Sequence, residues 1–486
     1  MRTTRQTLSP ASPQARQRWV LALTSVASLM VGLDILVVTT ALTTIRLRLG
    51  ASIEELEWIV NAYTLSFAVL LMTASALGDR FGRRRLFLTG LGLFTVMSAA
   101  CALAPSIGWL IVARAVQGAG SAMIMPHALA LLSAAYPPHR RARALGIFSG
   151  VTGLAILGGP MIGGVVVQGL AWPWIFWLNV PIGLAVIPLA ARKIGESRGS
   201  AARLDYGGVV LVTGTALGLV WGLVRGNTVG WGSPEVTGAL GGGVVLLVAF
   251  VAWEQRARAP MLPMRLFRSR AFAAGNAAGF GMFASIFGTV FFLAQFLQTT
   301  WHYGPLGAGL RLAPWTITLS LVAPAAGAWA GKIGERPLIA GGLALQAAGF
   351  AWVALAVRAG LGYPALVAPL VLAGCGASMA MPAAQSCVVG AVPPADLGKA
   401  AGTFNTLRQL GGTFGIAILA AVFTGAGSYA STRAFTAGFV PVVFVAAALS
   451  LAGAVAGAFI PGRPPVINTG TRAAGETDPH RLVRQT

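Results

Sequence analysis

Gly118-Ala-Gly-Ser-Ala-Met-Ile-Met-Pro126 recurs as Gly374-Cys-Gly-Ala-Ser-Met-Ala-Met-Pro382, and this repeat decides the fold. The match continues without a gap through a Pro-Pro pair, at 137–138 and 393–394, so that twelve of the 31 positions from 118 to 148 are identical at an offset of 256. Composition alone explains a few shared Gly and Ala residues, but it does not readily align Met-x-Met-Pro and Pro-Pro together. The chain therefore contains two related halves.

The composition indicates a chain that lies almost entirely within a membrane. Hydrophobic residues make up 56% of the 486 residues and charged residues only 10%, with a mean hydropathy of +0.75. A membrane span needs roughly 20 apolar residues. Fourteen such stretches are predicted, at about 19–44, 58–78, 86–104, 109–135, 144–168, 173–191, 205–224, 236–255, 272–300, 310–331, 338–358, 363–391, 400–424 and 434–460. The first is expected to be a retained helix, because it is too long for a signal peptide.

The repeat also predicts how these spans are organised. It relates the fourth and fifth spans to the twelfth and thirteenth, an offset of eight. Such a parallel repeat resembles that of major facilitator transporters, whose halves have six spans each, and the resemblance implies two extra spans between the halves. The expected all-α membrane protein therefore has a tail at 1–18, a six-helix bundle at 19–191 and a cytoplasmic linker with two extra helices at 192–258. A second six-helix bundle at 259–460 and a tail at 461–486 complete it.

The formal net charge of +22 is better explained by topology than by nucleic-acid binding. With the N-terminus inside, the inner segments hold 27 of the 35 Lys and Arg residues, the outer loops hold six, and two lie within spans. Positive residues collect in the cytoplasmic loops of membrane proteins. Both termini are therefore expected in the cytoplasm, with membrane lipids rather than nucleic acid as partners.

Asp34 is the only one of the thirteen acidic residues that is expected in the middle of a span. A charge in the bilayer is costly, so an ionisable residue there is a functional candidate. Burial favours the protonated form of a carboxyl group, and Asp34 is expected to take a proton from outside and release it inside. A structural Asp with satisfied hydrogen bonds is the alternative. The three cysteines fit no metal-binding pattern, and no metal is expected.

Arg114 is the only basic residue well inside a span of the first half, and Gln117 follows on the same helix face. Counting 1.5 Å per residue from the outer ends puts Asp34 and Arg114 at depths of roughly 15 and 8 Å. Two roles are open for Arg114. It either holds Asp34 ionised in one state and loses it in another, or it bonds backbone carbonyls of the first span and is structural.

Several motifs resemble those of one transporter family. The stretch Gly-Leu-Ala-Ile-Leu-Gly-Gly-Pro-Met-Ile-Gly-Gly at 153–164 contains residues that would break a soluble helix but allow close helix approach in a membrane. It resembles the antiporter signature on the fifth helix of major facilitator exporters, carried here by Gly153, Gly159, Pro160, Gly163 and Gly164. A generic packing face of small residues is the alternative. The surroundings of Asp34 and Arg114 resemble the family's first-helix and fourth-helix patterns, although Leu36 and Thr39 stand where the family often has Thr and Asn.

The stretch from 78 to 85, Gly-Asp-Arg-Phe-Gly-Arg-Arg-Arg, resembles the cytoplasmic signature of the same superfamily, with Ser75 in place of its leading glycine. The resemblance implies a conformational latch at the inner face, because charged contacts that differ between two states bias them. The residues assigned to this latch are Asp79, Arg80, Gly82, Arg83 and Arg84. The alternative is an ordinary positive-inside loop that happens to contain an acid.

A substrate cavity is expected near the midplane, between the two halves. The ninth span carries an aromatic stripe followed by amides, which would hold an amphipathic drug by apolar and π contacts. Its residues are Phe283, Phe287, Phe291, Gln295 and Gln298. Lipid-facing or core packing of the same stripe is the alternative. The further candidates for this cavity are Asn61, Met125, His127, Asn276 and Asn405.

The whole chain is similar to the fourteen-helix drug/proton antiporters of the major facilitator superfamily. That resemblance implies export of lipophilic or cationic drugs from a bacterial cytoplasm, as a monomer in the cell membrane, driven by protons and without a cofactor. The absence of a phosphate-binding motif argues against built-in nucleotide hydrolysis. An exporter of an endogenous metabolite or self-made antibiotic is the nearest alternative. A nutrient symporter or facilitator is less favoured, and no catalytic constellation indicates an enzyme.

Overall fold

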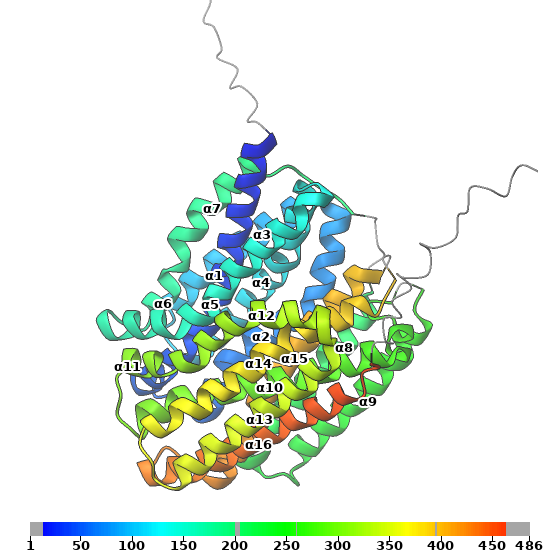
Figure 1. The fold of residues 1–486 in the computed structure, drawn as a ribbon. Helices are drawn as coiled ribbons and strands as arrows, with labels where there is room; N and C mark the ends of the chain where they lie inside the picture. Colours follow the sequence, from blue (N-terminus) through cyan, green and yellow to red (C-terminus); the bar gives the residue numbers. More distant parts are fainter. Residues whose placement is uncertain (1–12, 200–204, 259, 394–395, 463–486) are drawn as a thin grey trace, which may run out of the picture.

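The computed structural model describes residues 13–199, 205–258, 260–393 and 396–462, and these form helices without any strand (Figure 1). The helices are α1 (Pro13–Leu49), α2 (Ile53–Phe81), α3 (Arg83–Ala102), α4 (Ile107–Ala135), α5 (Pro138–Gly169), α6 (Trp174–Trp177), α7 (Asn179–Lys193), α8 (Tyr206–Val229), α9 (Pro234–Arg256), η1 (Met264–Arg268), α10 (Arg270–Thr299), α11 (Pro305–Arg311), α12 (Ala313–Ile333), α13 (Glu335–Arg358), α14 (Pro364–Gly390), α15 (Leu397–Ala426) and α16 (Thr432–Ala458).

Twelve of these helices, with α6 and α7 counted as one, are long and apolar enough to cross a membrane among the described residues. Two more, α5 and α12, cover the predicted spans at 144–168 and 310–331, and several of their side chains lie outside the described part of the chain. Many helices extend past the predicted spans. For example, α1 continues to Leu49, because hydropathy marks only the apolar section of a helix whose backbone hydrogen bonds continue into its polar ends.

The first seven helices pack among themselves, with α2 and α3 against α4, α5 against α1, and α7 against α3 and α1. Helices α2 and α3 are separated only by Gly82, whose φ of 114° lies in a region that side-chain-bearing residues rarely adopt. The last helices make a second set, in which α13 packs on α14 and α16, and α10 on α15 and α16. Gly334, at the corresponding break between α12 and α13, also has a positive φ, of 86°.

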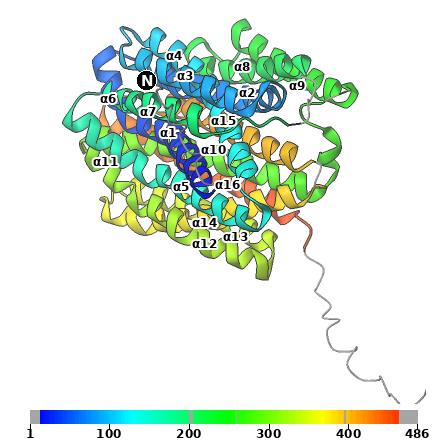
Figure 2. The same cartoon turned by 90° about the horizontal axis from the view of Figure 1, so that it is seen from above.

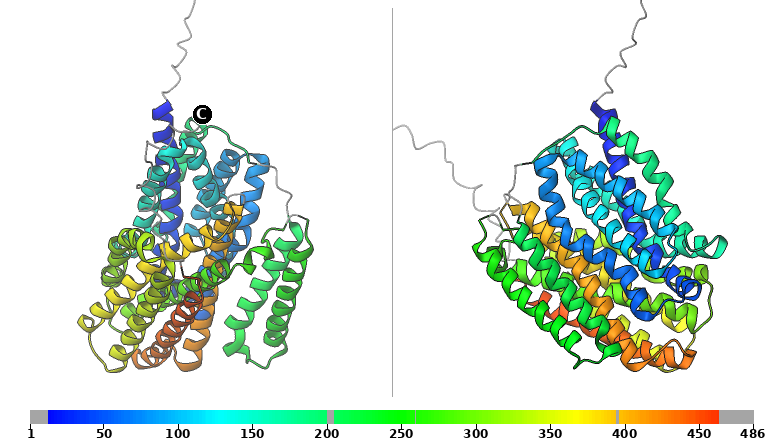
Figure 3. Two further views of the ribbon diagram at one scale, coloured as in Figure 1. Left: turned by 45° about the vertical axis from the view of Figure 1, so that its right-hand side comes forward. Right: turned by 180° about the vertical axis from the view of Figure 1, so that it is seen from behind.

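Figure 2 shows the two sets side by side, with α2, α3 and α4 on one flank, α12, α13 and α14 on the other, and α1, α10 and α15 between them. The helices α8 and α9 form a hairpin at the edge of the molecule, seen in green in Figure 3. They pack on each other, and α8 also contacts α2 and α15. Asn227 on α8 donates a 2.7 Å hydrogen bond to Thr424 of α15.

One end of the molecule holds the start of α1 and the loop with Arg80 to Arg85, and we call it the basic end. At the opposite, far end, the two sets of helices are joined by polar contacts. Gln298 of α10 donates to the Thr40 carbonyl of α1 (3.2 Å), and the Gln168 side chain of α5 accepts from the Leu306 amide of α11 (3.3 Å). The sets are therefore held together at the end away from the basic loops.

Tyr429, in the connection between α15 and α16, adds a further link at the far end. The Arg46 guanidinium of α1 lies over its ring at 4.1 Å, and its hydroxyl donates to Gln295 of α10. Burial raises the pKa of the Tyr429 phenol, so the hydroxyl remains a neutral donor.

Candidate functional site

The carboxylate of Asp34 lies at the centre of a polar cluster inside the first set of helices. Arg114 Nη1 of α4 is 2.5 Å from its Oδ2, while Gln117 Nε2 and Asn179 Nδ2 donate to its Oδ1 at 3.1 and 3.0 Å. Ser98 of α3 accepts from both amides, at 2.7 and 3.3 Å. Side chains from four helices, α1, α3, α4 and α7, therefore meet in one cluster.

The cluster is closed off from its surroundings. Asp34 is 3% exposed and Arg114 1%, and Gln117, Ser98 and Asn179 are buried as well. Hydrogen bonds to a charged group contribute about 1.5–3 kcal/mol each, whereas breaking a buried ion pair by removing one partner costs about 3–5 kcal/mol. Each of the two charges is therefore balanced by the other within a site that is closed to solvent.

Arg114 also contacts residues other than Asp34. Its Nη1 donates to Gln117 Oε1 at 2.7 Å, its Nε lies 3.3 Å from the carbonyl of Ile59, and its guanidinium stacks on the Tyr63 ring at 4.0 Å. The expected interaction with Asp34 is therefore present. The alternative was a bond to backbone carbonyls of the first helix, but the carbonyl that Arg114 contacts among the described residues is that of Ile59, which belongs to α2.

Sequence reasoning missed part of this cluster. Asn179 and Ser98 were not assigned to it, although Asn179 opens α7 directly after the four-residue helix α6. A polar residue at a helix break in an apolar span was the available signal. Sequence reasoning also underestimated a second acid. Glu57, expected just before the second span, lies within α2 and is buried, with Oε2 lacking a hydrogen-bond partner.

The glycines of the antiporter-like stretch bring α5 close to its neighbours. A Cβ at Gly159 would lie 2.6 Å from Leu36 Cβ of α1, and one at Gly163 would lie 2.8 Å from the Val37 carbonyl. A Cβ at Gly164 would lie 2.6 Å from Leu306 Cα of α11. Pro160 is buried inside α5 between these contacts. The surroundings of Gly153 lie outside the described side chains.

The residues assigned to the latch lie at the basic end and contact their own set of helices. Asp79 pairs with Arg83 at 2.7 Å across the Gly82 break. The Arg84 side chain donates to the carbonyls of Ala191 and Ile194, near the end of α7. Arg80 is exposed, with its guanidinium over the ring of the adjacent Phe81 at 5.3 Å.

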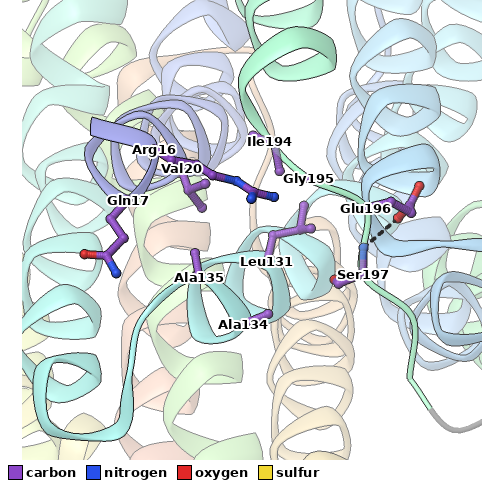
Figure 4. A pocket seen from close by; sticks show the side chains of 10 residues that line it. All are labelled: Arg16, Gln17, Val20, Leu131, Ala134, Ala135, Ile194, Gly195, Glu196 and Ser197. Atoms are coloured by element: carbon purple, nitrogen blue, oxygen red, sulfur yellow. Dashed lines mark hydrogen bonds between the residues drawn. The ribbon is translucent and has the colours of Figure 1, made fainter. Parts of the chain in front are cut away.

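Glu196 completes this arrangement by accepting from the Arg84 amide at 2.9 Å. The loop between α2 and α3 is thereby bound to the segment that follows α7. A cavity of about 350 Å³ opens beside it, shown in Figure 4. Its lining residues are Arg16, Gln17, Val20, Leu131, Ala134, Ala135, Ile194, Gly195, Glu196 and Ser197.

The residues assigned to a substrate cavity are dispersed. Gln295 and Gln298 belong to the contacts at the far end, and Phe291 is completely buried against Phe292. The core-packing alternative therefore describes Phe291 in this arrangement. His127 lies at the basic end, where it fills the space above Gly78 of α2.

The other candidates for this cavity differ in exposure. Asn61 is buried with both amide atoms lacking partners, and Asn276 donates to the Phe272 carbonyl of its own helix. Met125, Phe287 and Asn405 are partly exposed.

Comparison with known proteins identifies the family. The family model described as Major Facilitator Superfamily matches residues 24–415 and 275–482. The chain belongs to the major facilitator superfamily. This membership confirms the family expected from the motifs and identifies an integral membrane transporter rather than an enzyme. The fold agrees with a solved POT family transporter in complex with a thioalcohol conjugated peptide, at a TM-score of 0.67 and 17% identity, over 89% of this chain and 94% of that one.

Curated relatives of this superfamily member are named for resistance and export. A tetracenomycin C resistance and export protein of Streptomyces glaucescens is 35% identical over 85% of this chain and 77% of that protein. A cephamycin export protein of Amycolatopsis lactamdurans is 37% identical over 85% of this chain and 86% of that protein. A multidrug resistance protein of Mycobacterium tuberculosis is 34% identical over 84% of this chain and 76% of that protein.

Proposed function

We propose that the protein is a proton-coupled exporter of small amphipathic antimicrobial compounds from a bacterial cytoplasm, working by alternating access. The observation that carries the proposal is the buried Asp34–Arg114 pair inside a chain whose relatives are named for drug resistance and export. An acid that accepts hydrogen bonds from α4 and α7 changes its contacts when it takes up a proton. Such a change biases the equilibrium between two arrangements of the helices.

In this scheme the chain spans the membrane fourteen times, with the basic end and both termini in the cytoplasm. The two halves, at 19–191 and 259–460, rock about a central substrate site, and the segment 192–258 supplies the extra hairpin. The contacts of Gln298, Gln168 and Tyr429 close the outer side in the present arrangement. The pairing of Asp79 with Arg83 serves as the latch at the inner side.

The proton step follows from the contacts of Asp34. A proton entering from outside binds the carboxylate and neutralises it, so that Arg114 keeps only the Gln117 oxygen and the Ile59 carbonyl as acceptors among its described partners. Loss of the ion pair loosens α1 from α4. Release of the proton to the cytoplasm restores the pair and returns the transporter to its starting arrangement.

A second candidate function is the export of one antibiotic that the producing organism makes itself, and the names of the relatives favour it. Several relatives carry the names of single natural antibiotics, including tetracenomycin C and cephamycin. A dedicated exporter of one self-made antibiotic would use the same proton chemistry. It would differ only in the breadth of compounds that it carries.

The test is proton movement in proteoliposomes that hold a pH gradient, with tetracenomycin C and a cephamycin added in turn. We expect substrate-triggered proton flux that disappears in Asp34→Asn and persists in the control Glu235→Gln, which changes an exposed acid paired with Arg225. Substrate that only moves down its own gradient, without protons, would indicate a facilitator and overturn the proposal.

A further inference from the structure

Arg408 is a charged side chain without a described countercharge. It lies about 16 Å along α15 from the first residue of that helix, Leu397. Its Nε is buried with no hydrogen-bond partner, and its guanidinium takes part in none of the ion pairs found among the described residues. Its one described contact of note is the ring of Phe283 on α10, 5.3 Å away.

Two faces of α15 contact neighbouring helices, one face α2 and the other α8. Thr413 donates to Thr64 of α2 at 2.9 Å, and Gly402 lies beside Met72 of the same helix. Leu410, about 60° around α15 from Thr413, belongs to the apolar cluster in which α8 takes part. These contacts define the sides of α15 that face α2 and α8.

A third face of α15 packs on α10. A Cβ at Gly411 would lie 2.6 Å from the Phe280 carbonyl, and one at Gly415 would lie 2.5 Å from Ala284 Cα. The remaining face carries Ala401, Asn405, Arg408 and Gly412 at helical spacing. Around the axis of α15, this face lies between the face that contacts α2 and the face that contacts α10, on the side opposite α8. It therefore points into the interior between the two halves.

The side chains on this interior face fit one kind of ligand. Ala401, Asn405 and Arg408 are partly exposed, and so is Phe287, which lies against Gly412. The interior therefore offers an aromatic ring beside a cation. Uncompensated charge within a membrane protein is costly, and an ionisable residue there marks a ligand pathway by default.

The buried acids of the described residues are paired with other groups or lie at one end of the molecule. Asp34 is bound to Arg114, Glu254 accepts from the Leu262 amide near the basic end, and Glu57 lies in the first turns of α2 at the far end. Asp396, at the start of α15, is paired with Arg265. No other buried carboxylate of the described residues is left to neutralise Arg408.

We propose that Arg408 recognises an anionic group, a carboxylate or an ionised phenol, on an aromatic compound whose ring packs against Phe287. This inference rests on the proposed export function and names its substrate class. A guanidinium binds a carboxylate through two parallel hydrogen bonds. The same positive charge repels the cationic drugs that the sequence alone suggested as substrates.

An anionic substrate also changes the energetics of transport. An anion that leaves the cell carries negative charge outward, and a proton that enters carries positive charge inward. Both steps of the exchange therefore make the inside of the cell more positive. Each elementary charge that crosses the membrane gains energy from the membrane potential. Export of the anion is therefore accelerated by an inside-negative potential.

The experiment compares three probes that share one ring: 2-naphthoate, 2-naphthamide and 2-naphthylmethylammonium, at pH 7.5. Binding to the purified full-length protein is measured by equilibrium dialysis for the native chain, Arg408→Gln, Arg408→Lys and the control Arg358→Gln, which changes an exposed arginine at the end of α13. We expect the native chain and Arg358→Gln to bind naphthoate about 10- to 100-fold more tightly than the amide.

In Arg408→Gln the preference for naphthoate should vanish while amide binding stays, and Arg408→Lys should keep part of it. Equal binding of naphthoate and amide by the native chain, tighter binding of the ammonium, or an unchanged preference in Arg408→Gln would each overturn the proposal. Proton flux in proteoliposomes separates the two proposals. A preference for naphthoate that depends on Arg408, without any proton flux, would support the anion site and overturn proton coupling. Proton flux together with a preference for the ammonium would support proton coupling and overturn the anion site.

Discussion

Asp34 on α1 and Arg114 on α4, 80 residues apart in the sequence, form an ion pair of 2.5 Å with both side chains 1% exposed. A buried pair of this kind is weak evidence for stability, because the cost of removing two charges from water offsets their attraction. It is more informative about function. If either partner is removed, the other is left with an uncompensated buried charge, so the stability of each charge depends on the other.

The first prediction concerns this coupling. Asp34→Asn and Arg114→Gln should each lower the stability of the purified protein by about 3–5 kcal/mol, because each leaves one buried charge without its partner. The double variant should lose less than the sum of the two. Thermal unfolding in detergent measures all three, and strictly additive losses would show that the two charges do not depend on each other.

The second prediction concerns the close approach of α5 to α11. Gly164→Val should open the far end, because even the first side-chain carbon would lie 2.6 Å from Leu306 Cα. The reporter is the alkylation rate of Gln298→Cys from outside, in a chain whose three native cysteines are replaced by serine. We expect the rate to rise several-fold in Gly164→Val.

Gly169→Val is the matched control for that experiment, since nothing lies within 4 Å of a Cβ at Gly169. This variant should leave the alkylation rate unchanged. An equal rise in both variants would point to general loosening of α5 rather than to the contact with α11.

The third prediction concerns the proposed latch. The side chains of Asp79 and Arg83 are 28% and 24% exposed, so loss of their pair in Asp79→Asn should cost less than about 1 kcal/mol of stability. The transport rate in proteoliposomes should nevertheless fall about tenfold or more, a barrier change of about 1.4 kcal/mol. Arg85→Gln, which changes a more exposed neighbour, serves as control and should retain the native rate. Normal transport by Asp79→Asn would leave the basic loop with a topological role only.

The fourth prediction separates Arg408 from Arg114. Arg408→Met should raise the unfolding temperature of the substrate-free protein, since it removes a charge that has no described partner and with it the cost of holding that charge away from water. Arg114→Met should lower it, because Asp34 is then left alone. A fall in both variants would mean that Arg408 is already neutralised without substrate.

Most of the architecture was readable from local sequence. Apolar stretches of span length predicted the helices because a bilayer requires internal backbone hydrogen bonding along each apolar segment. The family motifs identified the superfamily, and the scarcity of acids identified Asp34. The breaks at Gly82 and Gly334 follow from positive φ values that only glycine adopts freely.

The sequence by itself thus determined a helical membrane transporter with one acid to examine, because hydropathy and single rare charges are properties of short segments. Only the tertiary structure decided which side chains meet that acid. Asn179 and Ser98 lie 145 and 64 positions from Asp34, and no spacing rule joins them. Likewise, Arg114 and Arg408 are both arginines within spans, but Arg114 meets a carboxylate and Arg408 faces the interior without one. The packing of the helices decided this difference, because a side chain's partner on another helix is not set by the residues next to it in the sequence.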